Sequence, residues 1–349
     1  MFSDLDEQLT ATLQHRAGGD VDPAPIVEQA RHRGRRLRLR RHGLIAGGVA
    51  AACVAVTSVV LAFPTGRDSD DPIMPAAALM LPEASGQSGA IARPEEVGAD
   101  PATVHFSTDA LVDGAEWATW SAGRGTESVE FRGPRGQARF ALARSLASLD
   151  GLQQTLSSAG RPQPRTNVHV GDRPGYAWFD PSGDRKLWFV QWQPADGLWA
   201  QLDIYARTQD EATGTAARVR FDSARRCVVP FRLGSLPPNG RLLECSVTLD
   251  RSERGPFAEG SLVVGDDAGR WLTVRAQLAP EGREARPAEL VAGPYRARRQ
   301  GSDVLEMVVK PCVVEAFRDG WGNGYTEADG LTILGGYQPT RDFDRPDTW

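Results

Sequence analysis

Few residues of this chain have the types and spacing that enzymatic chemistry needs. After residue 42 the histidines are His105 and His169, and no His-x-x-His, His-Glu-x-x-His or Cys-x-x-Cys motif occurs. Because protein zinc sites are built from such closely spaced ligands, the sequence predicts no metal and no cofactor. The segment Gly86–Gly89 (GQSG) lacks the last glycine of a nucleophile elbow. Gly320–Gly324 (GWGNG) fits a tight loop better than a phosphate-binding loop.

Acidic residues support one enzymatic alternative. A glycosidase needs two carboxylates that face each other across a cleft. Several acids fall in or near predicted elements, namely Asp203, Glu211, Glu244 and Glu306. Their spacing along the chain does not show which two of them would face each other across a cleft, and acids on half-exposed strands commonly face water. A cell-wall or glycan hydrolase is therefore the alternative hypothesis, and no catalytic residue is predicted.

Tryptophan side chains can bind ligands, and several of them are clustered in one part of this sequence. Four of the nine tryptophans lie close together in the sequence, at Trp178, Trp188, Trp192 and Trp199. Side-chain alternation places Trp188 and Trp192 on one face of a strand, with Leu187 and Phe189 on the other. These rings either fill the core between sheet and helix or form an aromatic floor for an acyl chain, a glycan or a peptide. The four tryptophans are the candidate ligand-binding residues.

Three cysteines, Cys227, Cys245 and Cys312, lie beyond the apolar stretch that holds the fourth, Cys53. In an oxidising compartment they predict one disulfide and one free thiol. Laid out as a meander, the second half of the chain puts Cys227 before its first strand and Cys312 at the start of its last. Both then lie at the same end of a sheet, so Cys227–Cys312 is the predicted bridge, with Cys245–Cys312 as the alternative.

One segment, Gly43–Phe63, has the length and composition of a transmembrane helix. Its 21 residues carry no charge, and as a helix they would be about 31 Å long, which matches a hydrocarbon core of roughly 30 Å. A basic block precedes it and includes Arg35, Arg36, Arg38, Arg40 and Arg41. Basic residues beside a span stay in the cytoplasm. The sequence predicts a single-pass plasma-membrane protein with its N-terminus inside and its C-terminal part extracytoplasmic.

The head, residues 1–42, contains a short amphipathic helix at residues 3–16, with Leu5, Leu9 and Leu13 on one face. Such a helix could dock a cytoplasmic regulatory partner such as a sigma factor. The arginine block is expected to contact anionic lipid headgroups. A formal net charge of −5 gives no indication of nucleic-acid binding.

Residues 64–102 are rich in proline, alanine, glycine, serine and acids and predict a tether. Their apolar piece, Met74–Leu81, is compatible with a strand, a short helix or a latch on the folded domain.

From residue 103 on, short apolar runs separated by turn residues predict strands. We expect an α+β fold, with the transmembrane helix followed by two tandem antiparallel sheet-plus-helix units at residues 103–226 and 227–349. Helices are predicted at Leu149–Ser158, Asp210–Phe221 and Thr326–Leu334. The predicted strands are Ser128–Phe131, Ala138–Leu142, Asn167–Phe179, Lys186–Gln193, Leu198–Ala206, Val228–Leu233, Leu242–Leu249, Ser261–Val264, Trp271–Leu278, Glu289–Arg298, Val304–Val309 and Val313–Arg318.

The two units align with each other in the order strand, strand, strand, helix. Glu211-Ala212 falls on Glu327-Ala328 at an offset of 116 residues, and Tyr176 falls on Tyr295 at an offset of 119. A nearly fixed offset indicates an internal duplication.

The tether, the Gly171–Tyr176 turn and strand, the tryptophan-rich hairpin and the closing helix resemble extracytoplasmic domains of uncharacterised actinobacterial single-pass membrane proteins. The run Phe231–Gly240 (FRLGSLPPNG) and the final Thr348-Trp349 carry the same resemblance. More distantly, the element order is similar to the lipoprotein-carrier and sigma-regulator families and to a mycobacterial lipoprotein family. The resemblance implies a non-enzymatic binding or sensing protein of the cell envelope. A purely structural envelope protein is a further alternative.

Overall fold

The computed structural model describes residues 79–153, 164–180, 186–251, 257–279, 287–318, 324–342 and 345–349. The expected head and the apolar segment Gly43–Phe63 lie outside these ranges. Among the described residues, no helix has the length and apolar character that a membrane crossing requires.

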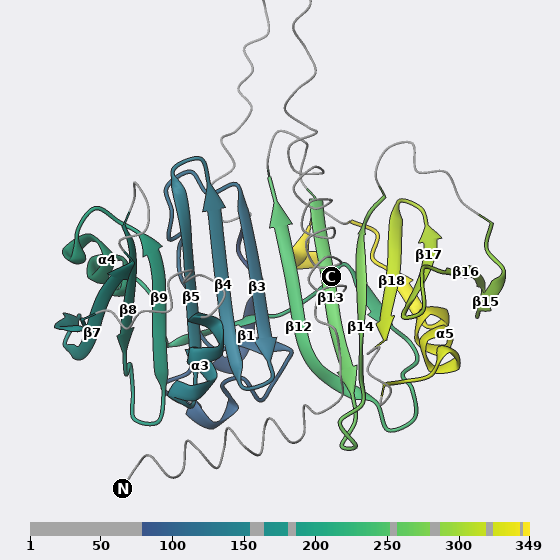
Figure 1. The fold of residues 1–349 in the computed structure, drawn as a ribbon, viewed down its shortest axis with the longest axis horizontal. Coiled ribbons are helices and arrows are strands. Elements are labelled where there is room, and N and C mark those ends of the chain that lie inside the picture. Colours follow the sequence, from purple (N-terminus) through teal and green to yellow (C-terminus); the bar gives the residue numbers. More distant parts are fainter. Residues whose placement is uncertain are drawn as a thin grey trace, which may run out of the picture. The chain divides into compact units, whose positions relative to one another are not determined.

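A single antiparallel sheet of fourteen strands dominates the fold, in the order β15-β16-β17-β18-β14-β13-β12-β3-β4-β5-β9-β8-β7-β6 (Figure 1). Its first half comprises β3 (Trp117–Gly123), β4 (Thr126–Gly133), β5 (Gly136–Ala143), β6 (Thr166–Val170), β7 (Arg173–Asp180), β8 (Leu187–Trp192) and β9 (Trp199–Tyr205).

The second half repeats this arrangement strand for strand. It comprises β12 (Arg241–Asp250), β13 (Phe257–Gly265), β14 (Trp271–Leu278), β15 (Leu290–Ala292), β16 (Tyr295–Arg299), β17 (Val304–Val309) and β18 (Cys312–Arg318). The halves join where β3 pairs with β12, from Trp117 opposite Asp250 to Gly123 opposite Glu244. Antiparallel pairing is thus confirmed, but the two expected units form one continuous sheet and the fold is mostly β with few helices.

Each half ends in a short helix that begins at a threonine cap. The side chain of Thr208 accepts a hydrogen bond from the Glu211 amide at the start of α4 (Gln209–Ala216). The side chain of Thr326, 118 residues later, does the same for the Asp329 amide at the start of α5 (Glu327–Gly335). Such caps satisfy amide groups that the first helical turn leaves unpaired. The caps align Glu211 with Asp329, two residues from the pairing that the sequence comparison suggests.

The helix α3 (Leu146–Gln153) packs on the opposite face of the sheet from α4. Its Leu149 contacts Ala141 and Ala143, whereas Ala212 of α4 belongs to the main core together with Phe140. The side chains of adjacent β5 residues therefore point to opposite faces of the sheet, as the alternation along a strand requires.

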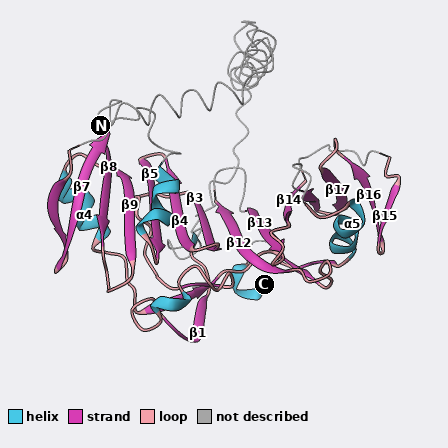
Figure 2. Ribbon diagram, turned by 60° about the horizontal axis from the view of Figure 1, so that its bottom comes forward, coloured by secondary structure: helices cyan, strands magenta, loops and turns pink. Residues whose placement is uncertain are grey.

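Two segments outside the large sheet cover the core face. The first, residues 79–112, includes β1 (Glu83–Ser88), η2 (Pro94–Glu96) and β2 (Thr103–Val104), and the second includes β10 (Ser223–Arg226) and β11 (Phe231–Leu233). β10 pairs with both β1 and β2, and Figure 2 shows β1 to one side of the large sheet. β11 pairs with β19 (Tyr337–Pro339), shortly before η3 (Pro346–Thr348).

The part of the expected tether from Leu79 onward packs against the domain. Leu79 and Leu81 are each 1% exposed, and the Leu79 carbonyl accepts a 2.9 Å hydrogen bond from the indole of Trp120. Of the three alternatives for Met74–Leu81, a latch on the domain fits these two leucines. One core cluster takes in Leu79, both sheet halves, α4 and α5.

The disulfide joins Cys227 to Cys245, and Cys312 is a buried free thiol. One bridge is confirmed, but the predicted Cys227–Cys312 pairing is wrong. The prediction placed Cys227 at the end of a meander. Instead the segment after β10 crosses the sheet face over its middle strands, where a Cβ on Gly260 of β13 would lie 2.6 Å from the Val229 side chain. Cys227 therefore lies above Cys245, which is in the middle of β12.

Two predicted strands are hairpins. Asn167–Phe179 is β6 and β7, which reverse at Gly171 with a φ of +61°, and Glu289–Arg298 is β15 and β16, which reverse at Gly293 with a φ of +55°. Glycine adopts such positive φ values without steric cost. The strand β3 was not predicted.

Candidate functional site

A cleft lies in the first half, where the end of β9 meets α4 and the β4–β5 turn. Its volume is about 660 Å³, and its lining also includes Leu111 to Asp113, just before β3, and Lys186, just before β8. Four stretches that are distant in the sequence therefore build one cavity. We call this cavity, lined by residues 111–113, 135–137, 186 and parts of 204–218, the basic cleft.

The floor of the basic cleft is apolar. Leu111 is 3% exposed, Val112 is 8%, and Ile204 and Ala206 are each 6% exposed. Thr215 of α4 also lines the cavity and is largely buried. These side chains offer a hydrophobic surface to a ligand that enters between the helix and the sheet.

The rim carries four basic side chains and two acidic ones, Arg135, Lys186, Arg207, Arg218, Asp113 and Glu211. Glu211 accepts a 3.0 Å hydrogen bond from the backbone amide of Arg207 and lies 3.5 Å from its guanidinium. The Lys186 amine lies 5.0 Å from the centre of the Phe179 ring. Arg218 donates to the hydroxyl of Thr215 at 3.4 Å. The rim therefore has an excess of positive charge.

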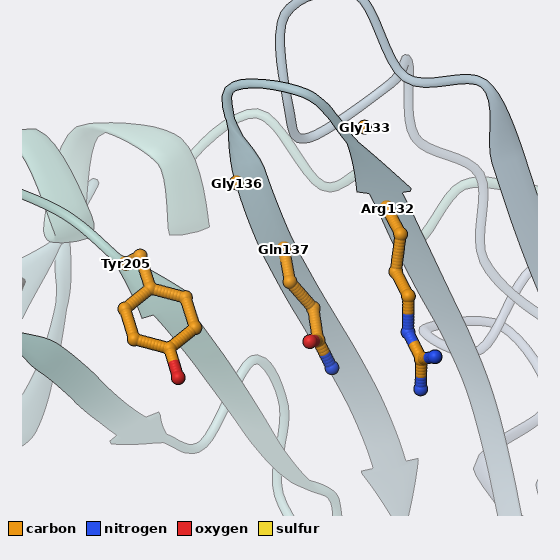
Figure 3. Close-up of a pocket in the computed structure, with 5 residues that line it drawn as sticks. All are labelled: Arg132, Gly133, Gly136, Gln137 and Tyr205. Atoms are coloured by element: carbon orange, nitrogen blue, oxygen red, sulfur yellow. The ribbon is translucent and has the colours of Figure 1, made fainter. Parts of the chain in front are cut away.

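A smaller hollow of about 300 Å³ adjoins the basic cleft and shares Gly136, Gln137 and Tyr205 with it. Figure 3 shows Tyr205, Gln137 and Arg132 side by side on neighbouring strands. Tyr205 as a residue is 43% exposed. Arg132 lies 4.6 Å from the ring centre of Trp117, and the Gln137 amide donates to Glu130 at 2.6 Å.

The corresponding corner of the second half carries different side chains at the matching positions. The residue before the helix cap is Tyr325 there, 3% exposed, where the first half has Arg207, whose side chain is 91% exposed. The helix position that corresponds to Thr215 is Ile333, which is fully buried in the core. At these two positions the second half therefore has a buried aromatic and a buried aliphatic side chain, where the first half has an exposed arginine and a threonine that line the cleft.

Charges at the second corner are neutralised within the protein. Arg270, on the β13–β14 turn, lies 2.6 Å from Asp266. Burial raises the pKa of Asp266, but hydrogen bonds from Arg270 outweigh it and hold that pKa below its usual range. Arg299 donates two hydrogen bonds to Glu327 of α5, at 2.6 and 2.7 Å. The basic cleft therefore differs from its counterpart in both side-chain type and charge.

The four tryptophans do not come together. Trp188 and Trp192 point into the main core. Trp178 lies on the opposite face and stacks on Phe189 with 5.4 Å between ring centres, and half-buried Trp199 packs against the α3 cluster. Both faces of β8 are buried, as the alternation suggests. None of the four lines the basic cleft or the smaller hollow, and their role in ligand binding stays a prediction.

The acids of the hydrolase hypothesis lie in different places. Glu211 is at the cleft rim, and Glu306 accepts from Arg298 at 2.6 Å. Burial raises the pKa of Asp203 to about 7, even though Gln201 donates a hydrogen bond to its carboxylate. Burial also raises the pKa of Glu244. The prediction that the protein is not an enzyme stays a prediction.

A buried polar cluster surrounds His105. Glu127 of β4 is fully buried and accepts hydrogen bonds from the Gly98 amide at 3.0 Å, the His105 amide at 2.6 Å and the His105 Nδ1 at 2.6 Å. The His105 Nε2 lies 3.4 Å from Glu96. Burial lowers the pKa of His105, but its contacts with Glu127 and Glu96 outweigh burial and raise that pKa overall. His169 is exposed on the edge strand β6.

This cluster fastens residues 93–106 to the sheet. It also lies beside a separate hollow of about 580 Å³ that Glu96 lines. Within the described ranges, no group of three or more histidine, cysteine or acidic side chains could hold a metal ion.

Sequence reasoning named one residue of the basic cleft, Glu211, as an acid of the hydrolase hypothesis, and it did not identify the others. One signal was available, because the duplicated helix caps place Arg207 and Tyr325 at matching positions with opposite character. The burial of Glu127 could not be predicted, because the sequence does not distinguish a buried acid on a strand from an acid on the solvent-exposed face.

No known protein family matches the chain, and no curated protein matches it. Among solved structures, the chain is similar to MucB in a crystal structure in complex with MucA(peri), at 13% identity and a TM-score of 0.22, covering 67% of this chain and 96% of that chain. A Pseudomonas aeruginosa MucA/MucB complex matches with the same identity, TM-score and coverage. A TM-score this low does not establish a shared fold, so functional inference rests on the chain's own residues.

Proposed function

We propose that this protein is a membrane-anchored, extracytoplasmic binding protein and that the basic cleft is its ligand site. The observation that carries the proposal is the contrast between the two halves. One fold occurs twice, and the matching positions hold buried Tyr325 and Ile333 in one copy and the cleft-lining Arg207 and Thr215 in the other.

The dimensions and lining of the cleft support a binding role. Ligand sites are concave, largely apolar and about 300–1,000 Å³ in volume, with a few polar groups that orient the ligand. The basic cleft, at about 660 Å³, has an apolar floor and charged groups at its rim.

The anchor is part of the proposal. The uncharged segment Gly43–Phe63 and the arginine block before it support an N-in, single-pass topology. The cleft then lies outside the plasma membrane and the leucine-striped helix at residues 3–16 lies inside. This arrangement suits a sensor whose cytoplasmic head contacts a regulatory partner such as a sigma factor.

The proposed ligand site can be tested by replacing two cleft residues of the first half with the residues found at the matching positions of the second half. In the double variant Arg207→Tyr, Thr215→Ile, the side chains of Tyr325 and Ile333 are copied to their matching positions. The full chain is purified from its host's envelope, denatured, and its extract analysed by mass spectrometry. We expect a small molecule in near-equimolar amount with the wild type and its loss from the double variant.

The matched control is Arg232→Tyr, at an exposed position of β11, which should retain the molecule. An empty wild-type protein, or a double variant that carries as much of the molecule as the wild type and shows the same melting temperature, contradicts the proposal. A folded but empty double variant supports it.

A further inference from the structure

We propose that the ligand of the basic cleft is an amphiphilic anion whose carboxylate or phosphate group is held by Lys186 and Arg218, while its apolar part contacts Leu111, Val112 and Ile204. This inference rests on the proposed function and specifies its ligand class.

Positive charge in the cleft is local. The chain as a whole has a formal net charge of −5 and 45 acidic residues, yet basic side chains outnumber acidic ones at this rim by four to two. Of the two acids, Glu211 is already engaged by the backbone and side chain of Arg207. An anion that enters the cleft therefore meets an attractive field, and a cation does not.

Lys186 and Arg218 are the cations best placed to receive that anion. Within the described ranges neither has a carboxylate at ion-pair distance. Lys186 contacts the face of Phe179, and Arg218 contacts the neutral hydroxyl of Thr215. Both contacts orient the side chain and leave donors free for a charge-assisted bond. Guanidinium and ammonium groups together are the usual partners of carboxylate and phosphate.

The matching corner of the second half supports the charge argument. There Arg270 lies against Asp266, and Arg299 donates to Glu327. Arg270 and Arg299 thus have acidic partners within the protein, whereas the described acids lie beyond ion-pair distance of Lys186 and Arg218 in the basic cleft.

The apolar floor favours a ligand that has an apolar part. Leu111, Val112 and Ile204 line the cleft beneath its charged rim, so a hydrocarbon chain would contact them there, whereas a bare inorganic anion would gain nothing from that contact. Burying an apolar chain there adds about 0.8 kcal/mol per methylene removed from water. Tyr205 and Gln137 of the adjoining hollow extend the surface for a longer ligand.

Calorimetric titration of the full chain in phosphatidylcholine nanodiscs tests the ligand class. The probes are hexyl phosphate, hexanoate, hexanol and inorganic phosphate. We expect the two amphiphilic anions to bind, and hexanol and inorganic phosphate to bind at least tenfold more weakly. Lys186→Gln and Arg218→Gln should each weaken hexyl phosphate binding about tenfold, as expected for loss of one hydrogen bond to a charged group.

The matched controls are Lys310→Gln and Arg232→Gln, which remove an exposed lysine and an exposed arginine in the other half. Both should bind hexyl phosphate as the wild type does. Hexanol binding equal to hexyl phosphate overturns the anionic class. Inorganic phosphate binding equal to hexyl phosphate overturns the apolar contact. Equal losses in the cleft and control variants overturn the assignment of Lys186 and Arg218.

Failure of this inference and failure of the proposed function give different results. If a neutral molecule is extracted from wild-type protein and lost from the Arg207→Tyr, Thr215→Ile variant, the function stands and the ligand class is wrong. A repeat in nanodiscs that contain phosphatidylglycerol distinguishes the source of the anion. Competition with hexyl phosphate there points to a lipid headgroup, and unchanged affinity points to a soluble molecule.

Discussion

The most informative perturbation of the fold is Glu127→Gln, at the centre of the cluster around His105. Glu127 is 0% exposed, and one carboxylate oxygen accepts from the Gly98 amide at 3.0 Å and the His105 Nδ1 at 2.6 Å. The other accepts from the His105 amide at 2.6 Å. Glutamine preserves the shape of the side chain, but it removes the charge and replaces one acceptor oxygen with a donor.

The substitution leaves at least one buried donor facing an amide NH2 group. An unsatisfied buried group costs about 1–3 kcal/mol, and breaking one side of a buried ion pair costs about 3–5 kcal/mol. We therefore expect the free energy of unfolding to fall by about 3 kcal/mol at a pH where His105 is charged. That loss is a large part of the stability of a typical domain.

The loss should depend on pH in a direction fixed by His105. Burial lowers the pKa of His105, but its contacts with Glu127 and Glu96 outweigh burial and raise that pKa above the ordinary histidine value of about 6.5. Stability from the charged pair is therefore fully present below about pH 6.5 and declines as the pH rises through the folded pKa. Removing Glu127 removes the main partner of His105, so the variant should show less of this decline.

Urea unfolding of the full chain, followed by tryptophan fluorescence at pH 6 and pH 8, measures both quantities. The expected loss is greater at pH 6 than at pH 8. Glu96→Gln is the control, because its side chain is 40% exposed and its loss should cost less than about 1 kcal/mol. A loss below about 1 kcal/mol for Glu127→Gln at both pH values would refute the reasoning.

Three further variants test the packing. Asp203→Asn should stabilise the fold by at least about 1 kcal/mol at pH 8 and not at pH 4, in urea titrations, because the folded pKa of about 7 makes wild-type stability fall between about pH 4 and pH 7. Cys227→Ser with Cys245→Ser should cost about 3 kcal/mol for a cross-link spanning 18 residues, and unreduced peptide mapping should find the two cysteines joined. Gly260→Ala should lower the melting temperature and cost about 1–3 kcal/mol, because its Cβ would lie 2.6 Å from Val229; an unchanged melting temperature contradicts that contact.

Local chemistry made much of the fold predictable. The Thr208 and Thr326 caps follow from side-chain chemistry within four residues, and strand alternation places Trp188 opposite in direction to Phe189. The join between the halves was not predictable, because the pairing of β3 with β12 links residues more than a hundred positions apart. The same limit explains the wrong disulfide, since the path of residues 227–230 across the sheet is set by tertiary packing.

The site was less predictable than the fold. The tryptophan cluster drew attention because aromatic residues are informative in the sequence, yet Trp188 and Trp192 fill the core. The basic cleft is formed by residues from four segments that are distant in the sequence. Taken alone, Lys186 or Arg218 is indistinguishable in the sequence from an ordinary solvent-exposed charge. The contrast between Arg207 and Tyr325 becomes informative only when the helix caps of the two halves are aligned.

The central claim is that ligand binds in the basic cleft of the first half. Hydrogen–deuterium exchange of the full chain, with and without the molecule extracted from its host's envelope, tests that claim most directly. The account predicts slower exchange at residues 111–113, 135–137 and 204–218 and unchanged exchange at the matching second-half segments, 266–270 and 324–336. Protection confined to the second-half segments or to β7 and β8, or no protection at all, would contradict it.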